Sequence, residues 1–348
     1  MNSGLIRIGL DALYYSGGHA LMSRFCRGIG VIFTLHRVRP RIPEPFHPNR
    51  ILEVSPEFLE SVIVETRRQG HEFVSLDEAH RRITEPGDHR PFACLTFDDG
   101  YRDNRDVAYP ILKRHNCPFA VYVATSFAAG TGNLWWLALE EIIRDADCVD
   151  IVLDGRERHF ETGTPREKEA AFSQIYWVLR RTDERRQRQI VSALAARHDV
   201  DLARLCARLV MGWGELRTFA REPLVTIGAH SVHHYSLAKL SEDEARAEIE
   251  GSVRIIGEKL GERPRHFAFP YGDAGSAGPR EFRLAAELGL KTAVTTRKGV
   301  VFAEHRQHPT GLPRVSLNGD YQSPHYVDLF LGGAPFLLWN GFRRLNVA

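Results

Sequence analysis

The sequence predicts an α/β protein with a mostly parallel sheet, either open or closed into a barrel. Short apolar runs typical of buried strands alternate along the chain with longer segments of helical periodicity. The chain has 348 residues, of which 43% are hydrophobic and 26% charged, a composition typical of a globular protein with a sizeable core. When residues 131–215 are set aside, about 260 residues remain, close to the roughly 250 of a typical β/α barrel.

The first third of the chain supplies four predicted strands and three predicted helices. Residues 30–35 (GVIFTL) and 92–97 (FACLTF) are short, apolar and rich in residues that favour strands. Residues 56–70 place apolar side chains among charged ones, and Gly70 stands where a helix often ends. The predicted strands are 30–35, 73–76, 92–97 and 119–123, and the predicted helices are 56–70, 77–83 and 107–115.

The same alternation returns after residue 215. The predicted strands there are 225–227, 267–269, 291–295 and 315–317, and the predicted helices are 241–260 and 280–288. Repeated strand–helix order of this kind indicates parallel strands joined by helices.

Residues 131–215 differ in composition from the segments on either side. They are rich in Arg, Glu, Ala and Gln, and they show helical periodicity over 165–179 and 183–198. We interpret them as a helical insertion in a single domain that spans residues 1–348, and we expect the insertion to decorate the barrel. The basic run at 180–188 (RRTDERRQR) could contact an anionic partner, but we favour a solvated helix face.

Charge and cysteine content exclude several classes of function. With 46 basic and 44 acidic residues the net charge is +2, so no nucleic-acid partner is expected. The five cysteines are odd in number, scattered and without a C-x-x-C pair, so neither a disulfide framework nor a cysteine zinc site is expected. A reducing, cytoplasmic location fits this pattern best.

The two ends of the chain bear on membrane contact. The first 35 residues contain charges that interrupt any apolar signal-peptide core. Residues 327–342 are largely apolar but are too short, and too broken by Pro335 and two glycines, to span a bilayer. We expect a packed terminal segment, with peripheral membrane contact through this segment as the alternative.

Two adjacent carboxylates follow a predicted buried strand. Asp98 and Asp99 come directly after residues 92–97, and in β/α barrels catalytic groups lie where strands end and loops begin. Two like charges this close raise one pKa unless a cation or a donor compensates them. A solvated Asp-Gly turn is the alternative for this motif alone.

Two histidines follow another predicted strand. His230 and His234 come after residues 225–227, and their spacing of four would place them on one face of a helical turn, where they can share a metal. With Asp99 they make a three-ligand set, which leaves positions open for water and substrate as catalytic metal sites do. A non-haem iron oxygenase uses the same ligand types, but the adjacent Asp98 has no role there.

Three motifs in order resemble those of the polysaccharide deacetylases, a family of carbohydrate esterases. They are TFDDG at 96–100, HSVHH at 230–234 and AFPY at 268–271. The resemblance implies a distorted (β/α)7 barrel that binds one divalent metal ion and acts on an acetylated glycan. Zinc is expected as that ion, with cobalt, nickel or iron as alternatives.

The resemblance also assigns roles to individual residues. It implies Asp98 as the catalytic base and Asp99, His230 and His234 as the metal ligands. It further implies that Pro270 and Tyr271 bind the substrate, with the backbone N–H of Tyr271 stabilising the oxyanion.

The chain departs from the family at two motifs. The arginine of the third motif is replaced by Ala268, and we expect Arg314 to orient Asp98 in its place, because an arginine fork holds a carboxylate well. The histidine of the fifth motif is not visible, and we assign the general acid to His308, with His305 and His36 as other candidates.

These observations predict a metal-dependent hydrolase that removes acetyl groups, above all N-acetyl groups, from a polysaccharide or oligosaccharide. A catalytically silent glycan-binding protein is the alternative, because two motif residues are missing. Four aromatic residues could support a sugar ring, although the core is the more common place for them. They are Tyr101, Trp135, Trp136 and Trp213.

Overall fold

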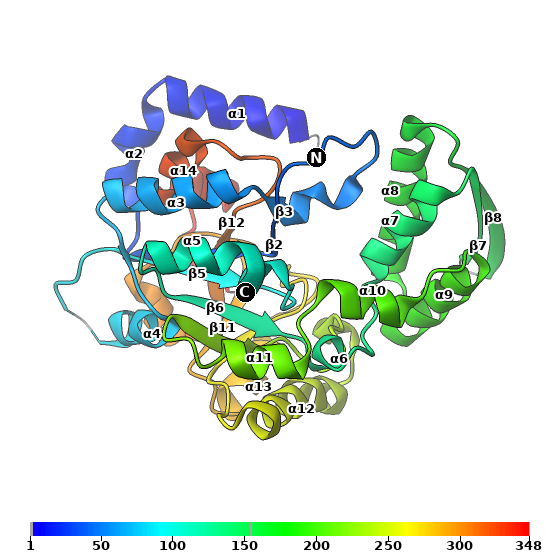
Figure 1. Ribbon diagram of the computed structural model, residues 1–348. Coiled ribbons are helices and arrows are strands. Elements are labelled where there is room, and N and C mark those ends of the chain that lie inside the picture. The colour runs from blue at the N-terminus through cyan, green and yellow to red at the C-terminus, as the bar shows by residue number, and fades with distance from the viewer. Residues whose placement is uncertain (1–2, 86, 154, 348) are drawn as a thin grey trace.

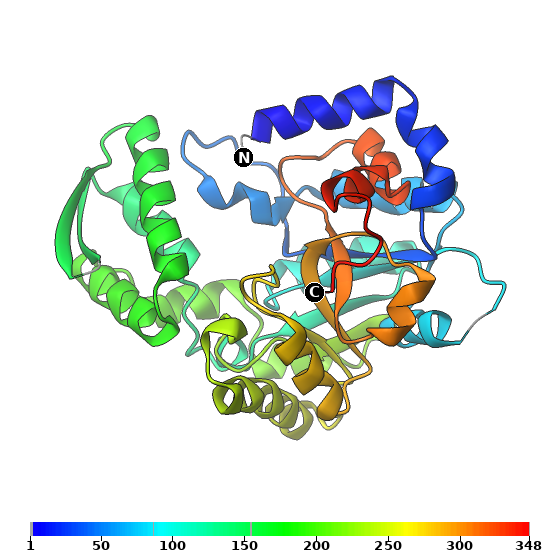
Figure 2. The same cartoon turned by 180° about the vertical axis from the view of Figure 1, so that it is seen from behind.

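Seven parallel strands close into a barrel at the centre of the molecule (Figures 1 and 2). The computed structural model describes residues 3–85, 87–153 and 155–347. Strand β1 pairs with β5 on one side and with β12 on the other, which closes the sheet and confirms the predicted (β/α)7 barrel. The barrel strands are β1 (Gly30–Leu35), β5 (Phe92–Phe97), β6 (Phe119–Val123), β9 (Val225–Ala229), β10 (His266–Ala268), β11 (Thr292–Lys298) and β12 (Leu312–Ser316).

Strands β1 and β5 lie side by side over their full length, from the pair Gly30 and Phe92 to the pair Leu35 and Phe97. Every residue of both strands is buried, because the barrel interior covers one face and the surrounding helices cover the other. A Cβ atom on Gly30 would lie 2.4 Å from the Phe92 ring, so only glycine fits at this point.

Helices surround the barrel in the order that the sequence predicts. Those that match predicted helices are α3 (Pro56–Arg68), α4 (Leu76–Thr84), α5 (Tyr109–Arg114), α12 (Glu242–Leu260) and α13 (Pro279–Glu287). The strand predicted at 73–76 is shorter and forms β4 (Glu72–Phe73) beside β5. It ends there because the Ser75 side chain accepts a hydrogen bond from the Glu78 N–H and begins α4.

Both ends of the chain form helices on one side of the barrel. The helices α1 (Ser3–Tyr15) and α2 (Gly18–Cys26) were not predicted, whereas α14 (Pro324–Leu331) and α15 (Ala334–Trp339) cover the apolar C-terminal segment. Helix α14 is buried against the barrel, as expected for a packed terminal segment. In the described part of the chain, no helix is both long and apolar enough to cross a membrane.

Residues 131–215 form a unit that stands beside the barrel, on the right in Figure 1 and on the left in Figure 2. Its buried apolar residues, such as Trp135, Ile175 and Leu194, form a hydrophobic cluster that also includes Tyr101 and Phe127 from the barrel side. Its helices are α7 (Trp135–Asp145), α8 (Pro165–Arg181), α9 (Glu184–Arg197) and α10 (Leu202–Leu209), and α11 (Trp213–Phe219) begins at its end.

The insertion also contains an antiparallel pair, β7 (Cys148–Leu153) and β8 (Arg156–Glu161), that was not predicted. Strand β7 buries only alternate residues, and β8 (RERHFE) is exposed apart from Phe160, which is intermediate. Polar strands of this kind carry little sequence signal, so the prediction of a purely helical insertion was incomplete.

Arginines of the basic run at 180–188 form hydrogen bonds between the insertion and the barrel. Arg180 donates to Asp273 at 2.8 Å, and Arg188 donates to the carbonyl oxygen of His234 at 3.1 Å. Both side chains are largely buried, at 11% and 14% exposure. The interpretation of this run as a solvated helix face was therefore wrong for these two arginines.

Candidate active site

Polar residues gather where barrel strands end, and several of them have an unusual backbone. Asp98 and Asp99 follow β5, the loop 230–234 follows β9, and Tyr271 lies beyond β10. Among the described residues other than glycine, seven have positive φ, and four of these belong to the site: Asp99, Ser231, His234 and Tyr271. Such conformations cost roughly 1–3 kcal/mol each and collect where surrounding structure holds a site in one shape.

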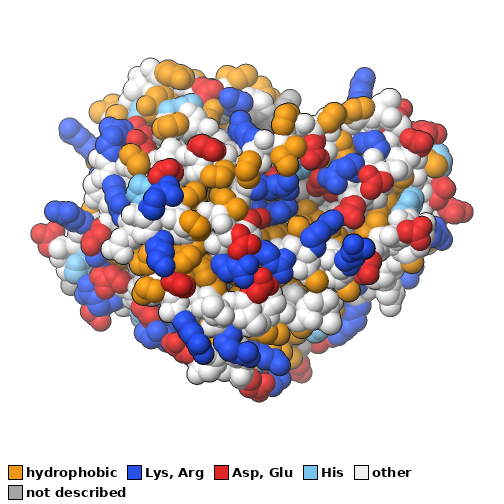
Figure 3. Space-filling view, in the orientation of Figure 1, with side chains coloured by type: hydrophobic (Ala, Val, Ile, Leu, Met, Phe, Trp, Pro, Cys, Tyr) orange, Lys and Arg blue, Asp and Glu red, His pale blue; other side chains and the backbone are white. Residues whose placement is uncertain are grey.

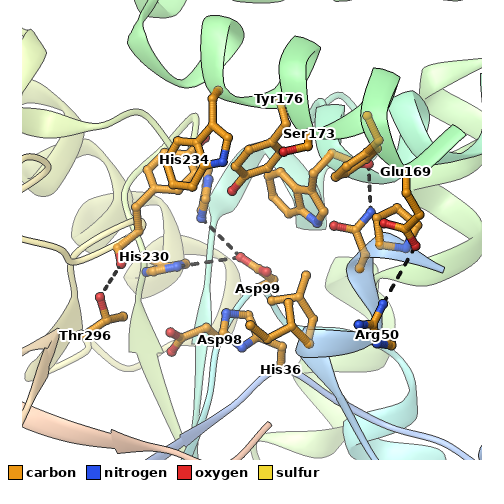
Figure 4. Close-up of a pocket in the computed structure, with 18 residues that line it drawn as sticks. His36, Arg50, Asp98, Asp99, Glu169, Ser173, Tyr176, His230, His234 and Thr296 are labelled. Carbon is orange, nitrogen blue, oxygen red and sulfur yellow. Dashed lines mark hydrogen bonds and ion pairs between the residues drawn. The ribbon is translucent and has the colours of Figure 1, made fainter. Parts of the chain in front are cut away.

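Asp99, His230 and His234 direct ligand atoms toward a common point (Figure 4). Asp99 Oδ1 lies 3.3 Å from His234 Nε2 and 3.6 Å from His230 Nε2. His230 Nδ1 lies 2.7 Å from the carbonyl oxygen of Ala268. This nitrogen therefore donates its proton to the carbonyl, which leaves Nε2 free to bind a metal.

The electrostatics of these three residues fit a bound cation. Burial and the neighbouring carboxylate of Asp98 raise the pKa of Asp99 well above its ordinary value. Burial lowers the pKa of His234 well below its ordinary value, so this imidazole is neutral. Asp99 Oδ1 is buried without a hydrogen-bond partner in the described structure. A divalent cation would compensate the carboxylate and accept the imidazole lone pairs.

The histidines lie in a loop, so the expected helical turn was wrong. Residues 230–234 turn back on themselves, and the Ser231 hydroxyl accepts a hydrogen bond from the His234 N–H at 2.9 Å. Glu248 of α12 fixes the loop from behind, accepting from two backbone N–H groups at 3.0 and 2.8 Å. His233 pairs with the same Glu248 at 2.5 Å and is not a wall residue of the site.

Arg314 of β12 forms a two-pronged pair with Asp98. Its Nη1 and Nη2 atoms donate to the two carboxylate oxygens at 2.8 and 2.6 Å, and both side chains are buried. Its Nε donates to the carbonyl oxygen of Thr295 at 2.8 Å, which fixes the plane of the guanidinium. Burial alone would raise the pKa of Asp98, but Arg314 offsets burial and holds this pKa below its usual range. Asp98 is therefore ionised.

Tyr271 sits at a tight turn held by both the barrel and the insertion. The Gly272 N–H donates to the carbonyl oxygen of Pro270 across Tyr271, and the Tyr271 carbonyl oxygen accepts from Thr296 at 2.6 Å. From the insertion, Trp135 donates to the Tyr271 hydroxyl at 2.9 Å. The Arg180 guanidinium lies 3.8 Å from the centre of the Tyr271 ring.

A cavity of about 510 Å³ opens above these groups and reaches the insertion. In Figure 4, Glu169, Ser173 and Tyr176 descend from α8 toward Asp98 and Asp99. The insertion side of the cavity is formed by Trp136, Glu169, Phe172, Ser173, Tyr176 and Trp177. The barrel side includes His36, Asp98, Asp99, His230, His234, Tyr271 and Thr296.

One face of α8 thus forms a wall of the cavity. Its wall residues recur at intervals of three and four, which is the spacing of a single helix face. Arg50 of the barrel side reaches Glu169 at 3.8 Å across the mouth. This wall was not predicted from the sequence, although the helical spacing of aromatic residues over 169–177 was a visible signal.

The structure does not bring His308 to the cavity. His308 follows the short helix η4 (Ala303–Gln307) and precedes β12, so it lies at the amino end of the barrel, whereas Asp98 follows the carboxyl end of β5. His305 is buried in η4 and bonded to the backbone of Phe302. Of the three histidines named from the sequence as general acids, His36 alone lines the cavity.

The expected aromatic platforms are only partly present. Trp136 lines the cavity, whereas Tyr101 and Trp135 are fully buried in the core. Trp213 packs against the hydrophobic core of the barrel. Tyr176 and Trp177, which the sequence analysis did not single out, face the cavity instead.

Comparison with solved structures finds chains of the same fold. The chain is similar to the Streptococcus pyogenes deacetylase PplD in complex with acetate, with a TM-score of 0.58, 17% identity and coverage of 87% of this chain and 97% of that one. It is also similar to IcaB from Ammonifex degensii, with a TM-score of 0.53, 18% identity and coverage of 86% and 96%. At these identities the likeness shows the fold alone.

The sequence itself gives the family. Residues 86–293, more than half of the chain, match the family model of polysaccharide deacetylase. The chain therefore belongs to the polysaccharide deacetylases, hydrolases that cleave amide bonds of acetylated glycans. A comparison with proteins of curated function finds no match.

Proposed function

We propose that this deacetylase removes N-acetyl groups from a polysaccharide or oligosaccharide and requires one divalent cation. One observation carries the proposal: Asp99, His230 and His234 converge beside Asp98, whose charge Arg314 preserves. Asp99 has the buried oxygen without a hydrogen-bond partner, so we assign it as a metal ligand. Asp98 remains free to accept a proton. When bound by this set, zinc, or cobalt, nickel or iron, supplies the Lewis acidity that activates water and polarises the acetyl carbonyl.

Asp98 accepts the proton of the attacking water in this proposal. The water oxygen bonds to the acetyl carbon, the C–N bond breaks, and acetate and a free amine leave. The backbone N–H of Tyr271 donates to the developing oxyanion, and the turn at Pro270 and Gly272 holds that backbone in place. Arg314 is a positioning residue, because it acts on the reaction only through Asp98.

The role that we propose for His36 differs from the general-acid role first assigned to His308. It lines the cavity near Asp98, as Figure 4 shows. Burial lowers the pKa of His36 to about 4, so it is neutral in the free protein. The proton for the leaving amine therefore has to come from the water, through Asp98, and we assign to His36 the orientation of that leaving group.

The substrate class rests on the shape of the cavity. A wall that combines Tyr176 and Trp177 with the polar Glu169 and Ser173 suits a sugar, which presents apolar ring faces and polar edges. Arg50 and Glu169 meet at the mouth with side chains that are 58% and 44% exposed, so a chain longer than one sugar could extend past them into solvent. The cytoplasmic location expected from the cysteine pattern stays a prediction.

Acetate release tests the proposal. The purified full-length chain is incubated with N-acetylated and O-acetylated glycans, before and after treatment with a chelator, and after return of zinc. We expect release from an N-acetylated glycan, loss with the chelator and recovery with the metal. Binding of these glycans without acetate release at any metal concentration would instead support a silent glycan-binding protein.

A further inference from the structure

Large hydrophobic side chains are exposed mainly on one group of helices. Among the described residues, twelve large hydrophobic side chains are exposed, and eight of them belong to α1, α2, α15 or the turn after α15. They are Leu5, Ile8, Tyr15, Leu21, Phe25, Leu338, Trp339 and Phe342. We call this set the helical apolar surface. Figure 3 shows orange side chains gathered along the top edge, over α1 and α2.

The exposed apolar residues of α1 and α2 recur at helical spacing. On α1, Leu5, Ile8 and Tyr15 recur at helical spacing and are exposed, while Leu10 and Leu13 pack against the core. On α2, Leu21 and Phe25 stand four apart and are both exposed. These helices are therefore apolar on the outer face as well as on the inner one, which is unusual for a helix that ends in water.

A groove lies between α1 and α15, on the face of α1 that carries Ile6 and Leu10. It has a volume of about 120 Å³ and lies between Ile6 and Leu10 of α1 and Phe336 and Trp339 of α15. Lys298 lies at its edge, with its ammonium 3.7 Å from the centre of the Trp339 ring. Of the eight residues of the helical apolar surface, Trp339 lines this groove and the other seven lie outside its lining.

The charges around this surface are mainly basic. Arg24 and Arg343 are exposed on it, and within the described chain neither forms an ion pair. The nearby carboxylates already accept hydrogen bonds from the chain itself. Asp11 accepts from Tyr326 at 2.7 Å, and Asp328 accepts from Gln69 at 2.7 Å. The surface therefore offers apolar side chains with basic groups beside them.

We propose that the helical apolar surface docks on the interface of a bilayer that contains anionic phospholipids. Amphipathic helices with exposed Leu, Phe and Trp and flanking arginines bind in the plane of such an interface, and Tyr and Trp settle at the headgroup level. Trp339, which lies beside Lys298, would sit at the headgroup level. Arg24 and Arg343 would pair with the lipid phosphates. The helices lie on the membrane and do not cross it.

This surface lies next to the catalytic cavity. Thr296 lines the cavity, and Lys298, two residues further along β11, lines the apolar groove. Docking through Trp339 would therefore hold the cavity close to the membrane surface. The proposal rests on exposure and charge, so it stands whether or not the chain releases acetate.

Vesicle sedimentation of the full-length chain tests the proposal. We expect the wild-type chain to sediment with vesicles of mixed phosphatidylcholine and phosphatidylglycerol and to remain in solution with phosphatidylcholine alone. Raising the salt from about 0.1 M to about 1 M shortens the screening length from roughly 10 to roughly 3 Å and should weaken the binding. Arg24→Glu with Arg343→Glu should reduce partitioning by at least about fivefold for each arginine.

Two further variants separate the apolar contribution from the general effect of mutation. Ile8→Asp with Phe25→Asp should abolish sedimentation, whereas Val64→Asp, on the exposed side of α3, should sediment as the wild type does. Brominated lipid should quench Trp339 fluorescence, and Trp339→Phe should remove that quenching. Failure of the wild type to bind anionic vesicles at low salt would overturn the proposal. A dimer in solution that Ile8→Asp dissociates would assign the surface to a second copy and would also overturn it.

Discussion

At the scale of single residues, the site separates two neighbouring aspartates by giving them different partners. Asp98 turns toward Arg314 of β12, which keeps it ionised, and Asp99 turns toward His230 and His234, where only a cation would complete its surroundings. Asp99 also has a positive φ, which is part of the backbone turn that directs its side chain to the two histidines. Two carboxylates that would otherwise repel each other thereby take separate roles.

An isosteric pair of variants tests this division. Asp98→Asn should keep the bound metal and lower kcat by about 10²–10⁴-fold, because it removes only the base. Asp99→Asn should lose most of the metal, because an amide replaces a charged ligand. Metal content by mass spectrometry and acetate release are measured on the same samples. If Asp98→Asn lost the metal and Asp99→Asn kept it, the two roles would be reversed.

Arg314 can be tested as a positioning residue. Arg314→Met should lower kcat by roughly 100-fold, because Asp98 loses the orientation of its carboxylate, while zinc binding persists. Unfolding in urea should show a loss of stability of about 3–5 kcal/mol, because a buried carboxylate is left unpaired.

Arg314→Lys is the matched control for that variant. It restores the charge without the two-pronged geometry, and we expect an intermediate kcat with better stability than the methionine variant. Wild-type kcat in a folded, metal-loaded Arg314→Met would show that the pair with Asp98 has no part in catalysis.

At the scale of elements, one face of α8 packs in the hydrophobic cluster of the insertion and another face lines the cavity. A capping box of Thr164 and Glu167 begins the helix, and Ile175 and Leu179 are buried in the cluster of the insertion. The adjoining side brings Tyr176 and Trp177 to the cavity. The insertion is therefore more than a decoration of the barrel, because it forms this wall of the cavity.

Trp177 is an exposed wall residue, at 55% exposure, and we expect it to support the outer part of a glycan. If a sugar covers about 40 Å² of the ring, Trp177→Ala loses roughly 1 kcal/mol of binding, a rise in KM of about fivefold for a long glycan. The kcat for a short acetylated substrate should be unchanged. Val64→Ala, at an equally exposed site outside the cavity, is the control. Equal effects on long and short substrates would contradict the assignment.

At the scale of the whole molecule, closure of the barrel brings distant strands to one rim. Arg314 and Asp98 are 216 residues apart in sequence, yet β12, β1 and β5 are neighbours in the barrel. The close contact of β1 and β5 depends on Gly30, where a side chain would meet the Phe92 ring. The geometry of the site therefore depends on packing at the opposite end of these strands.

Gly30→Ala tests that dependence. The added methyl group has no room beside Phe92, so the free energy of unfolding in urea should fall by about 1–3 kcal/mol. Gly214→Ala is the control, because nothing lies within 4 Å of its Cβ position in α11, and a helical alanine should leave stability equal or higher. Unchanged stability of Gly30→Ala would mean that the β1–β5 contact can relax.

The sequence by itself determined the alternation of strands and helices and the motifs around Asp98, Asp99, His230 and His234. These features are local, because strand ends, helical spacing and short motifs can be recognised within a few residues. The bond between Arg314 and Asp98 could be proposed from the sequence, but only the neighbouring positions of their strands in the closed barrel could place the guanidinium at the carboxylate.

Only the tertiary structure decided the other features. It placed His308 at the wrong end of the barrel and His36 at the cavity, since a residue before a parallel strand and one after it lie at opposite rims. It turned one face of α8 toward the site, which depends on how the insertion packs on the barrel through residues such as Arg180 and Arg188. Which side of a helix meets a cavity depends on long-range packing, which periodicity alone does not specify.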